Sequence, residues 1–142
     1  MYRPFAVLLL LASSAACSDL TYQAPTAWRG TLLPRTEAGI TGSVAAVSEG
    51  RRQTQAGFEM DGTAGTTFGW QMNHGTCANP GPILGGRGAY ANVTTNASGE
   101  GRVESTFISV LMSPGEQFHA VIVDAQNRSL ILACGDLEEA SF

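Results

Sequence analysis

The sequence predicts an all-β fold, an antiparallel sandwich or barrel, from three observations. Short segments that alternate polar and apolar residues recur through residues 28–142. Gly-rich turns separate them at about the 8–12-residue spacing that is typical of sandwiches and barrels. No long window after the N-terminal segment combines a helical period with capping residues.

The individual strands follow in order along the chain. The first is expected to start near Trp28, and residues 40–47 form the next alternating segment. Residues 53–60 run into Asp61-Gly62, which is a hairpin or turn signal. The other strands are expected within residues 66–73, 91–95, 102–112, 118–125 and 129–137, and residues 74–90 are expected to form a long loop.

The N-terminus, residues 1–16, has the composition of a secretory signal. Arg3 precedes a short apolar run, which is too short for a membrane-spanning helix, and small residues lead to Cys17. The segment resembles a bacterial lipoprotein signal, in which this cysteine is lipidated and becomes the new N-terminus. The residue three before the cysteine is Ser14, where the pattern usually has Leu. An ordinary cleaved signal beside a stray thiol is the alternative.

The rest of the chain divides into a tether, residues 17–27, and one domain, residues 28–142. Ser18 and Asp19 after the lipidated cysteine favour the outer membrane of a bacterial envelope over the inner one. The formal charge is −4, and all eight basic residues are Arg. They form no cluster larger than Arg51-Arg52, which argues against a nucleic-acid partner. The predicted partners are the membrane, through the lipid, and an unidentified envelope protein or ligand.

The chain has three cysteines. If Cys17 carries the lipid, Cys77 and Cys134 remain, and in an oxidising compartment they are most simply one disulfide. Two buried free thiols are the alternative.

Several motifs together resemble the copper/zinc superoxide dismutase fold, and more closely its bacterial lipoprotein relatives and the chordin-type (CHRD) domains. These motifs are "WQMNHGTC" at residues 70–77, "NPGPILGG", "FHAVIVDA" and the ending "LILACGDL". The resemblance covers about residues 28–137. It implies an eight-stranded Greek-key sandwich in which Cys77 is bonded to Cys134.

The functional residues of that family do not carry over. The resemblance places its two early copper ligands at Gln71 and Asn73, the later copper ligand at Asp124, and the anion-steering Arg at Ile131. The stretch after Cys77 lacks the His and Asp of a zinc loop. Gln71, Asn73 and Asp124 are expected to lie together as a hydrogen-bonded polar cluster, whose oxygens could otherwise suit a hard cation such as calcium.

These residues predict a lipid-anchored envelope protein whose sandwich is a binding or structural module, with no catalytic residues and no cofactor. The alternative is a copper-binding or superoxide-dismutase-related protein that keeps metal affinity through His74, His119 and Asp124. The ligand count argues against it, because copper prefers several imidazoles and the chain has two histidines. A third possibility is a generic disulfide-linked sandwich whose family likeness is coincidental.

Overall fold

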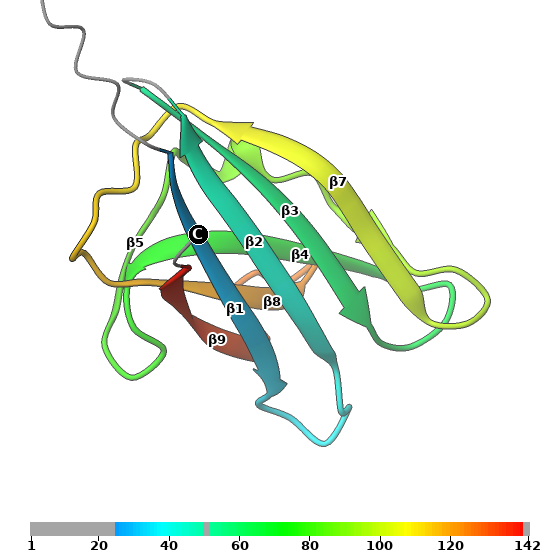
Figure 1. Ribbon diagram of the computed structural model, residues 1–142. Helices are drawn as coiled ribbons and strands as arrows, with labels where there is room; N and C mark the ends of the chain where they lie inside the picture. Colours follow the sequence, from blue (N-terminus) through cyan, green and yellow to red (C-terminus); the bar gives the residue numbers. More distant parts are fainter. Residues whose placement is uncertain (1–24, 50–51, 141–142) are drawn as a thin grey trace, which may run out of the picture.

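The computed structural model describes residues 25–49 and 52–140, so the predicted signal segment and Cys17 lie outside the described residues. Nine strands in these residues form an antiparallel sheet that curls into two facing layers (Figure 1). The prediction of an all-β sandwich or barrel is confirmed. Within the same residues, no helix has the length and apolar character needed to cross a membrane.

The first layer consists of four strands that pair in the order β1, β2, β3, β7. They are β1 (Thr26–Pro34), β2 (Thr41–Glu49), β3 (Gln53–Asp61) and β7 (Glu100–Ile108). β3 shows the alternation expected of a strand with one buried face, because Thr54, Ala56, Phe58 and Met60 are buried and their neighbours are not. β1 begins at Thr26, so the end of the predicted tether already belongs to the sheet.

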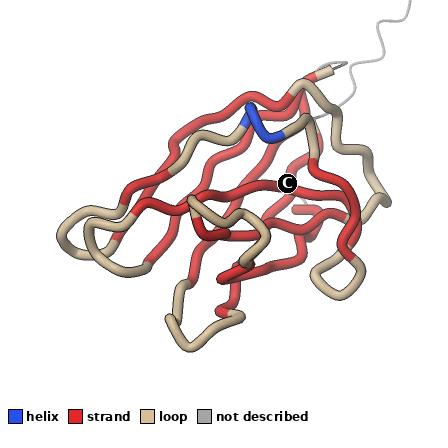
Figure 2. Tube along the Cα trace, turned by 180° about the vertical axis from the view of Figure 1, so that it is seen from behind, coloured by secondary structure: helices blue, strands red, loops and turns tan. Residues whose placement is uncertain are grey.

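The second layer pairs in the order β5, β4, β8, β9. Its strands are β4 (Thr67–Gly75), β5 (Pro80–Ile83), β8 (Phe118–Asp124) and β9 (Ile131–Ala140), and the short β6 (Val93–Thr94) also pairs with β4. β5 and a 3-10 helix, η1 (Arg87–Ala89), occupy the stretch that was expected to be a loop. Figure 2 shows η1 in blue, joined on both sides to loop segments.

β9 joins the two layers, because it pairs with β8 on one side and with β1 on the other. At Gly135 the strands approach so closely that a Cβ atom would collide with the backbone oxygen of Thr31. Glycine is therefore required at this position. β1 and β9 are therefore held together where the two layers meet.

The chain crosses between the layers after Asp61-Gly62, because β3 and β4 are consecutive in sequence but do not pair. This dipeptide therefore marks a turn and not a hairpin. β7 returns beside β3, and β8 returns beside β4, which are crossover connections of the Greek-key type. Residues 96–99 form a turn, in which Asn96 Oδ1 accepts hydrogen bonds from the backbone N–H groups of Ser98 at 2.8 Å and Glu100 at 3.0 Å.

Aromatic side chains from both layers fill the core. Phe58 of β3 stacks on Trp70 of β4, with ring centroids 4.7 Å apart. Tyr90 meets Trp70 edge to face at 5.0 Å, and Trp28 meets Phe118 in the same way at 5.9 Å. Such pairs add about 0.5–1.5 kcal/mol each to the effect of burial. The aromatic contacts tie the two layers to each other.

Tyr90 generates the first prediction. Its hydroxyl donates a hydrogen bond to Leu84 O at 2.9 Å, and burial raises the pKa of that hydroxyl well above its usual range. We expect Tyr90→Phe to lower the free energy of unfolding by about 1 kcal/mol at pH 7, because the carbonyl group of Leu84 loses its partner.

The same residue predicts a pH dependence. Tyrosine in the unfolded chain ionises near pH 10, whereas folded Tyr90 stays neutral to higher pH, so its contribution is complete below about pH 10 and falls as the pH rises further. Denaturant unfolding of wild type and Tyr90→Phe from pH 8 to pH 11.5 should therefore show a steeper alkaline decline for wild type. Parallel declines would contradict this account of Tyr90.

Candidate functional site

A row of polar side chains crosses the outer face of the second layer. Met72 of β4 is buried in the core, so Gln71 and Asn73 on either side of it point outward. The strand register places Asn73 opposite His119 of β8, and His119 opposite Asp136 of β9. Because opposite residues of antiparallel strands share a face, Asn73, His119 and Asp136 form one row.

Gln71 and Asn73, the predicted remnants of the metal site, are brought together. Gln71 Nε2 donates to Asn73 Oδ1 at 3.2 Å. Asn73 Nδ2 in turn donates to the backbone oxygen of Gly81 in β5, also at 3.2 Å. The two amides therefore tie β5 to the edge of β4, where the two strands have an irregular register.

Asp124 does not join this cluster, and the prediction that it would do so is wrong. It lies opposite Phe68, whereas Asn73 lies opposite His119, five residues earlier in β8 and about 17 Å away along the strand. Asp124 Oδ1 accepts hydrogen bonds from the backbone N–H groups of Gln126 at 2.8 Å and Asn127 at 2.7 Å. Its carboxylate shapes the turn between β8 and β9.

The two histidines lie on opposite faces of the second layer. His119 is 1% exposed on the outer face, and its Nδ1 atom is buried without a hydrogen-bond partner. His74 is on the alternate face of β4, where its ring lies 5.4 Å from the ring of Phe118. His74, His119 and Asp124 therefore do not converge, so this alternative ligand set does not form a site.

The row that does form is a weak donor set for a metal. It offers one imidazole, one amide and the carboxylate of Asp136, a residue that the sequence interpretation did not single out. Its position two residues after Cys134 on a strand was the available signal, since that spacing puts both on one face. In the described parts of the chain, no group of three or more His, Cys, Asp and Glu residues could hold a metal ion.

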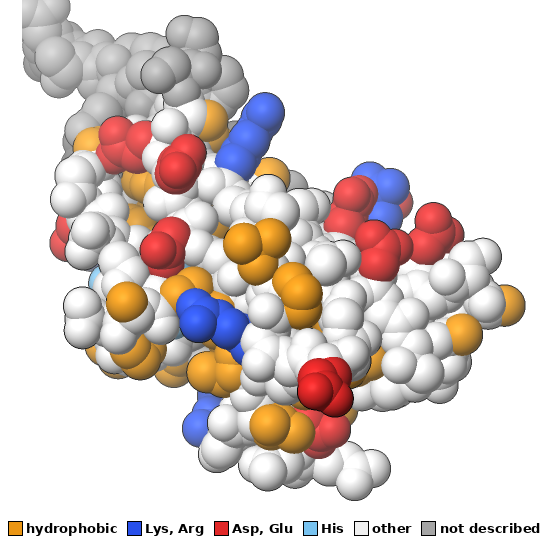
Figure 3. All heavy atoms as spheres, turned by 90° about the horizontal axis from the view of Figure 1, so that it is seen from below, with side chains coloured by type: hydrophobic (Ala, Val, Ile, Leu, Met, Phe, Trp, Pro, Cys, Tyr) orange, Lys and Arg blue, Asp and Glu red, His pale blue; other side chains and the backbone are white. Residues whose placement is uncertain are grey.

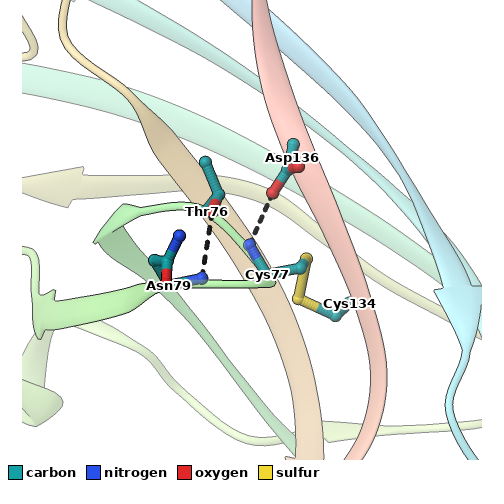
Figure 4. The surroundings of a disulfide bond; sticks show 5 residues. All are labelled: Thr76, Cys77, Asn79, Cys134 and Asp136. Carbon is teal, nitrogen blue, oxygen red and sulfur yellow. Dashed lines mark hydrogen bonds between the residues drawn. A yellow bond between two sulfur atoms is a disulfide. The ribbon is translucent and has the colours of Figure 1, made fainter.

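The disulfide between Cys77 and Cys134 is present, as predicted, and its Cα atoms are 6.0 Å apart. Figure 4 shows that the turn after β4 is also held by hydrogen bonds at this point. Asp136 Oδ1 accepts from the backbone N–H of Cys77 at 2.6 Å, and Thr76 Oγ1 accepts from that of Asn79 at 3.1 Å. The disulfide and Asp136 thus attach the same loop to β9 twice.

The attached loop covers the part of the outer face that lies beside the row of Asn73, His119 and Asp136. Val121 and Val123 point outward from β8, yet they are 2% and 1% exposed. They form a small apolar cluster with Cys134, against which Cys77 packs. The part of this face around Val121 and Val123 is therefore covered, whereas Asp136 at its β9 edge is exposed.

The outer face of the first layer is open and hollowed. A groove of about 700 Å³ lies across β9, β1, β2, β3 and β7, and a second hollow of about 620 Å³ adjoins it, sharing Thr31, Ser43, Glu59 and Arg102. Four carboxylates and two guanidinium groups line the larger part. Figure 3, which views the molecule from below, shows acidic side chains in several groups, with arginine side chains beside some of them.

A scan against protein-family models finds none that matches this chain, and a search of curated proteins finds no significant match. The fold and the site define a disulfide-linked antiparallel β-sandwich with one sealed outer face and one open outer face. The likeness to superoxide dismutase rests on the sequence motifs alone.

The disulfide generates a prediction about stability. It closes a loop of 57 residues, so replacing both Cys77 and Cys134 by Ser should lower the free energy of unfolding by about 4 kcal/mol in the chain-entropy model. Urea unfolding of the variant and of wild type measures the difference. Wild type treated with reductant is the control and should unfold like the variant. A loss below about 1 kcal/mol would show that the disulfide is not a main constraint on the fold.

Proposed function

We propose that this protein is an exported, lipid-anchored module of the bacterial cell envelope, and that its sandwich binds a partner and does not catalyse a reaction. The observation that carries the proposal is the use of Gln71 and Asn73 as scaffold hydrogen bonds. The resemblance to superoxide dismutases would place copper ligands at these two positions. Amides held in this way do not supply the imidazoles that copper prefers.

The disulfide supports an exported location. Disulfides persist in oxidising compartments such as the periplasm and are rare in the cytosol. Cys134 is buried beside Val121 and Val123 of β8, and Cys77 packs against this cluster, so the bond is part of the folded structure. This agrees with the secretory character of residues 1–16.

The proposed anchor would keep the sandwich near a lipid surface, by preference the outer membrane. Thr26, where β1 starts, comes nine positions after Cys17. Even fully extended, this stretch spans no more than about 30 Å. The domain would therefore meet partners close to the membrane.

The absence of a copper centre is testable. The full chain carrying Cys17→Ser, purified in detergent, is exposed to Cu²⁺ or Zn²⁺, dialysed and analysed for metal by mass spectrometry. We expect no stoichiometric retention, because His74 and His119 lie on opposite faces. His74→Gln and His119→Gln are the matched variants. One copper ion per chain, lost in either variant, would overturn the non-catalytic proposal in favour of a copper protein.

The lipid anchor is tested separately by growing an expressing bacterium with radiolabelled palmitate. Wild type should incorporate label and partition into the detergent phase, and Cys17→Ser should do neither, because it lacks the acceptor thiol. The double variant Cys77→Ser, Cys134→Ser is the control and should keep the label. Equal labelling of wild type and Cys17→Ser would contradict lipidation at this residue.

A further inference from the structure

The open groove has a small-residue floor and charged rims. The register sets Thr31 opposite Ser43 and Ala45 opposite Gly57, so three short side chains and a glycine cross from β1 to β3 on the outer face. Gly57 also sits at the point where the register of β3 against β7 shifts. Such irregularities bend a strand, and here the bend coincides with the hollow.

The dimensions of the floor match one extended chain. It spans the three strands β1 to β3, about 10 Å across, since neighbouring strands are about 4.8 Å apart. The adjoining hollow continues it along β3 as far as Asp61. Four residues from Gly57 to Asp61 correspond to about 13 Å. A segment of four or five residues in an extended conformation would fill this length.

The charges of the rims favour a cationic occupant. Arg102 is paired with Glu59 at 3.4 Å, and Arg29 lies opposite Glu138 in the ladder between β1 and β9. With both arginines beside a carboxylate, Glu104 and Asp61 are left as acidic groups on the rim of β7 and at the far end of β3. The groove therefore has an excess of negative charge, in a chain whose formal charge is −4.

The floor does not suit a sugar or a nucleobase. Phe58 is the one aromatic residue that lines the described groove, and its ring is buried in the core against Trp70. The lining of the groove therefore presents no aromatic face on which a planar base could stack. The small floor residues Thr31, Ser43, Ala45 and Gly57 leave room for a backbone and its short side chains.

We propose that this groove binds an extended polypeptide segment that carries Arg or Lys side chains, with its backbone over Ala45 and Gly57 and its cations against the rim carboxylates. The proposal rests on the proposed function, because it names the partner class of the binding module. The attraction is between exposed charges, so it weakens as salt screens them.

The test is fluorescence anisotropy of labelled eight-residue peptides with the full chain carrying Cys17→Ser in detergent. The probes alternate Ser with Arg, Gln or Glu. We expect the Arg peptide to bind more tightly than the Gln peptide, and the Glu peptide to bind least. Raising the salt concentration from 20 mM to 200 mM should reduce the affinity for the Arg peptide. Equal affinity for the three peptides would overturn the proposal.

Two variants locate the binding. Ala45→Trp places a large side chain on the floor of the groove and should weaken binding of the Arg peptide at least tenfold. Ala91→Trp, on an exposed loop outside the groove, should leave that binding unchanged. Glu104→Gln should weaken binding of the Arg peptide by about threefold, the effect of one exposed charge pair. Glu116→Gln, in the loop after β7, should leave that binding unchanged. Unchanged affinity in Ala45→Trp would place the peptide elsewhere and overturn the proposal.

Other outcomes separate the two proposals. If the protein self-associates in sedimentation experiments and Ala45→Trp abolishes that self-association, the groove is occupied by a second copy of the chain. This result would overturn the inference of a cationic peptide partner. Failure of the Arg peptide to bind, with no metal retained, overturns the peptide inference and leaves the non-catalytic module. Stoichiometric copper retention would instead overturn the proposed function.

Discussion

The structure depends on how β9 is shared between the two layers. This strand hydrogen-bonds with β8 and with β1, and at Gly135 it passes so near Thr31 that a side chain would not fit. Cys134, the residue before that glycine, forms the disulfide with Cys77. Asp136, the residue after the glycine, accepts a hydrogen bond from the backbone N–H of Cys77. Three consecutive residues thus join the layers and attach the loop after β4.

This arrangement gives the two outer faces different properties. On the second layer, the attached loop covers Val121 and Val123, and the amides of Gln71 and Asn73 are used to hold β5. On the first layer, short side chains leave a hollow between charged rims. A surface that is covered and hydrogen-bonded is poorly suited to bind a ligand, whereas the open one can admit a partner without rearrangement. The physical contrast between the faces is therefore the basis of the binding role that we propose.

Sequence patterns predicted the fold well where the physical signal is local. Alternation in β3 and the turn chemistry of Asn96 depend on near neighbours, and both were visible in the sequence. The strand register is set by long-range pairing, so the sequence could not show that Asp124 lies opposite Phe68, far from Asn73. β5 was missed because Pro and Gly dominate it, and it is held through the side chain of Asn73. The role of Asp136 likewise depends on a residue 59 positions away.

The central claim is that His119 is a structural residue sealed between β4 and β9 and not a metal ligand. Nuclear magnetic resonance of the chain with ¹⁵N-labelled histidine, titrated with Zn²⁺, tests it directly. We expect the ring nitrogens of His119 to keep their chemical shifts throughout the titration while the disulfide is intact. Saturable shifts of His119 at one Zn²⁺ per chain would contradict the account, because they would show that the buried imidazole binds metal.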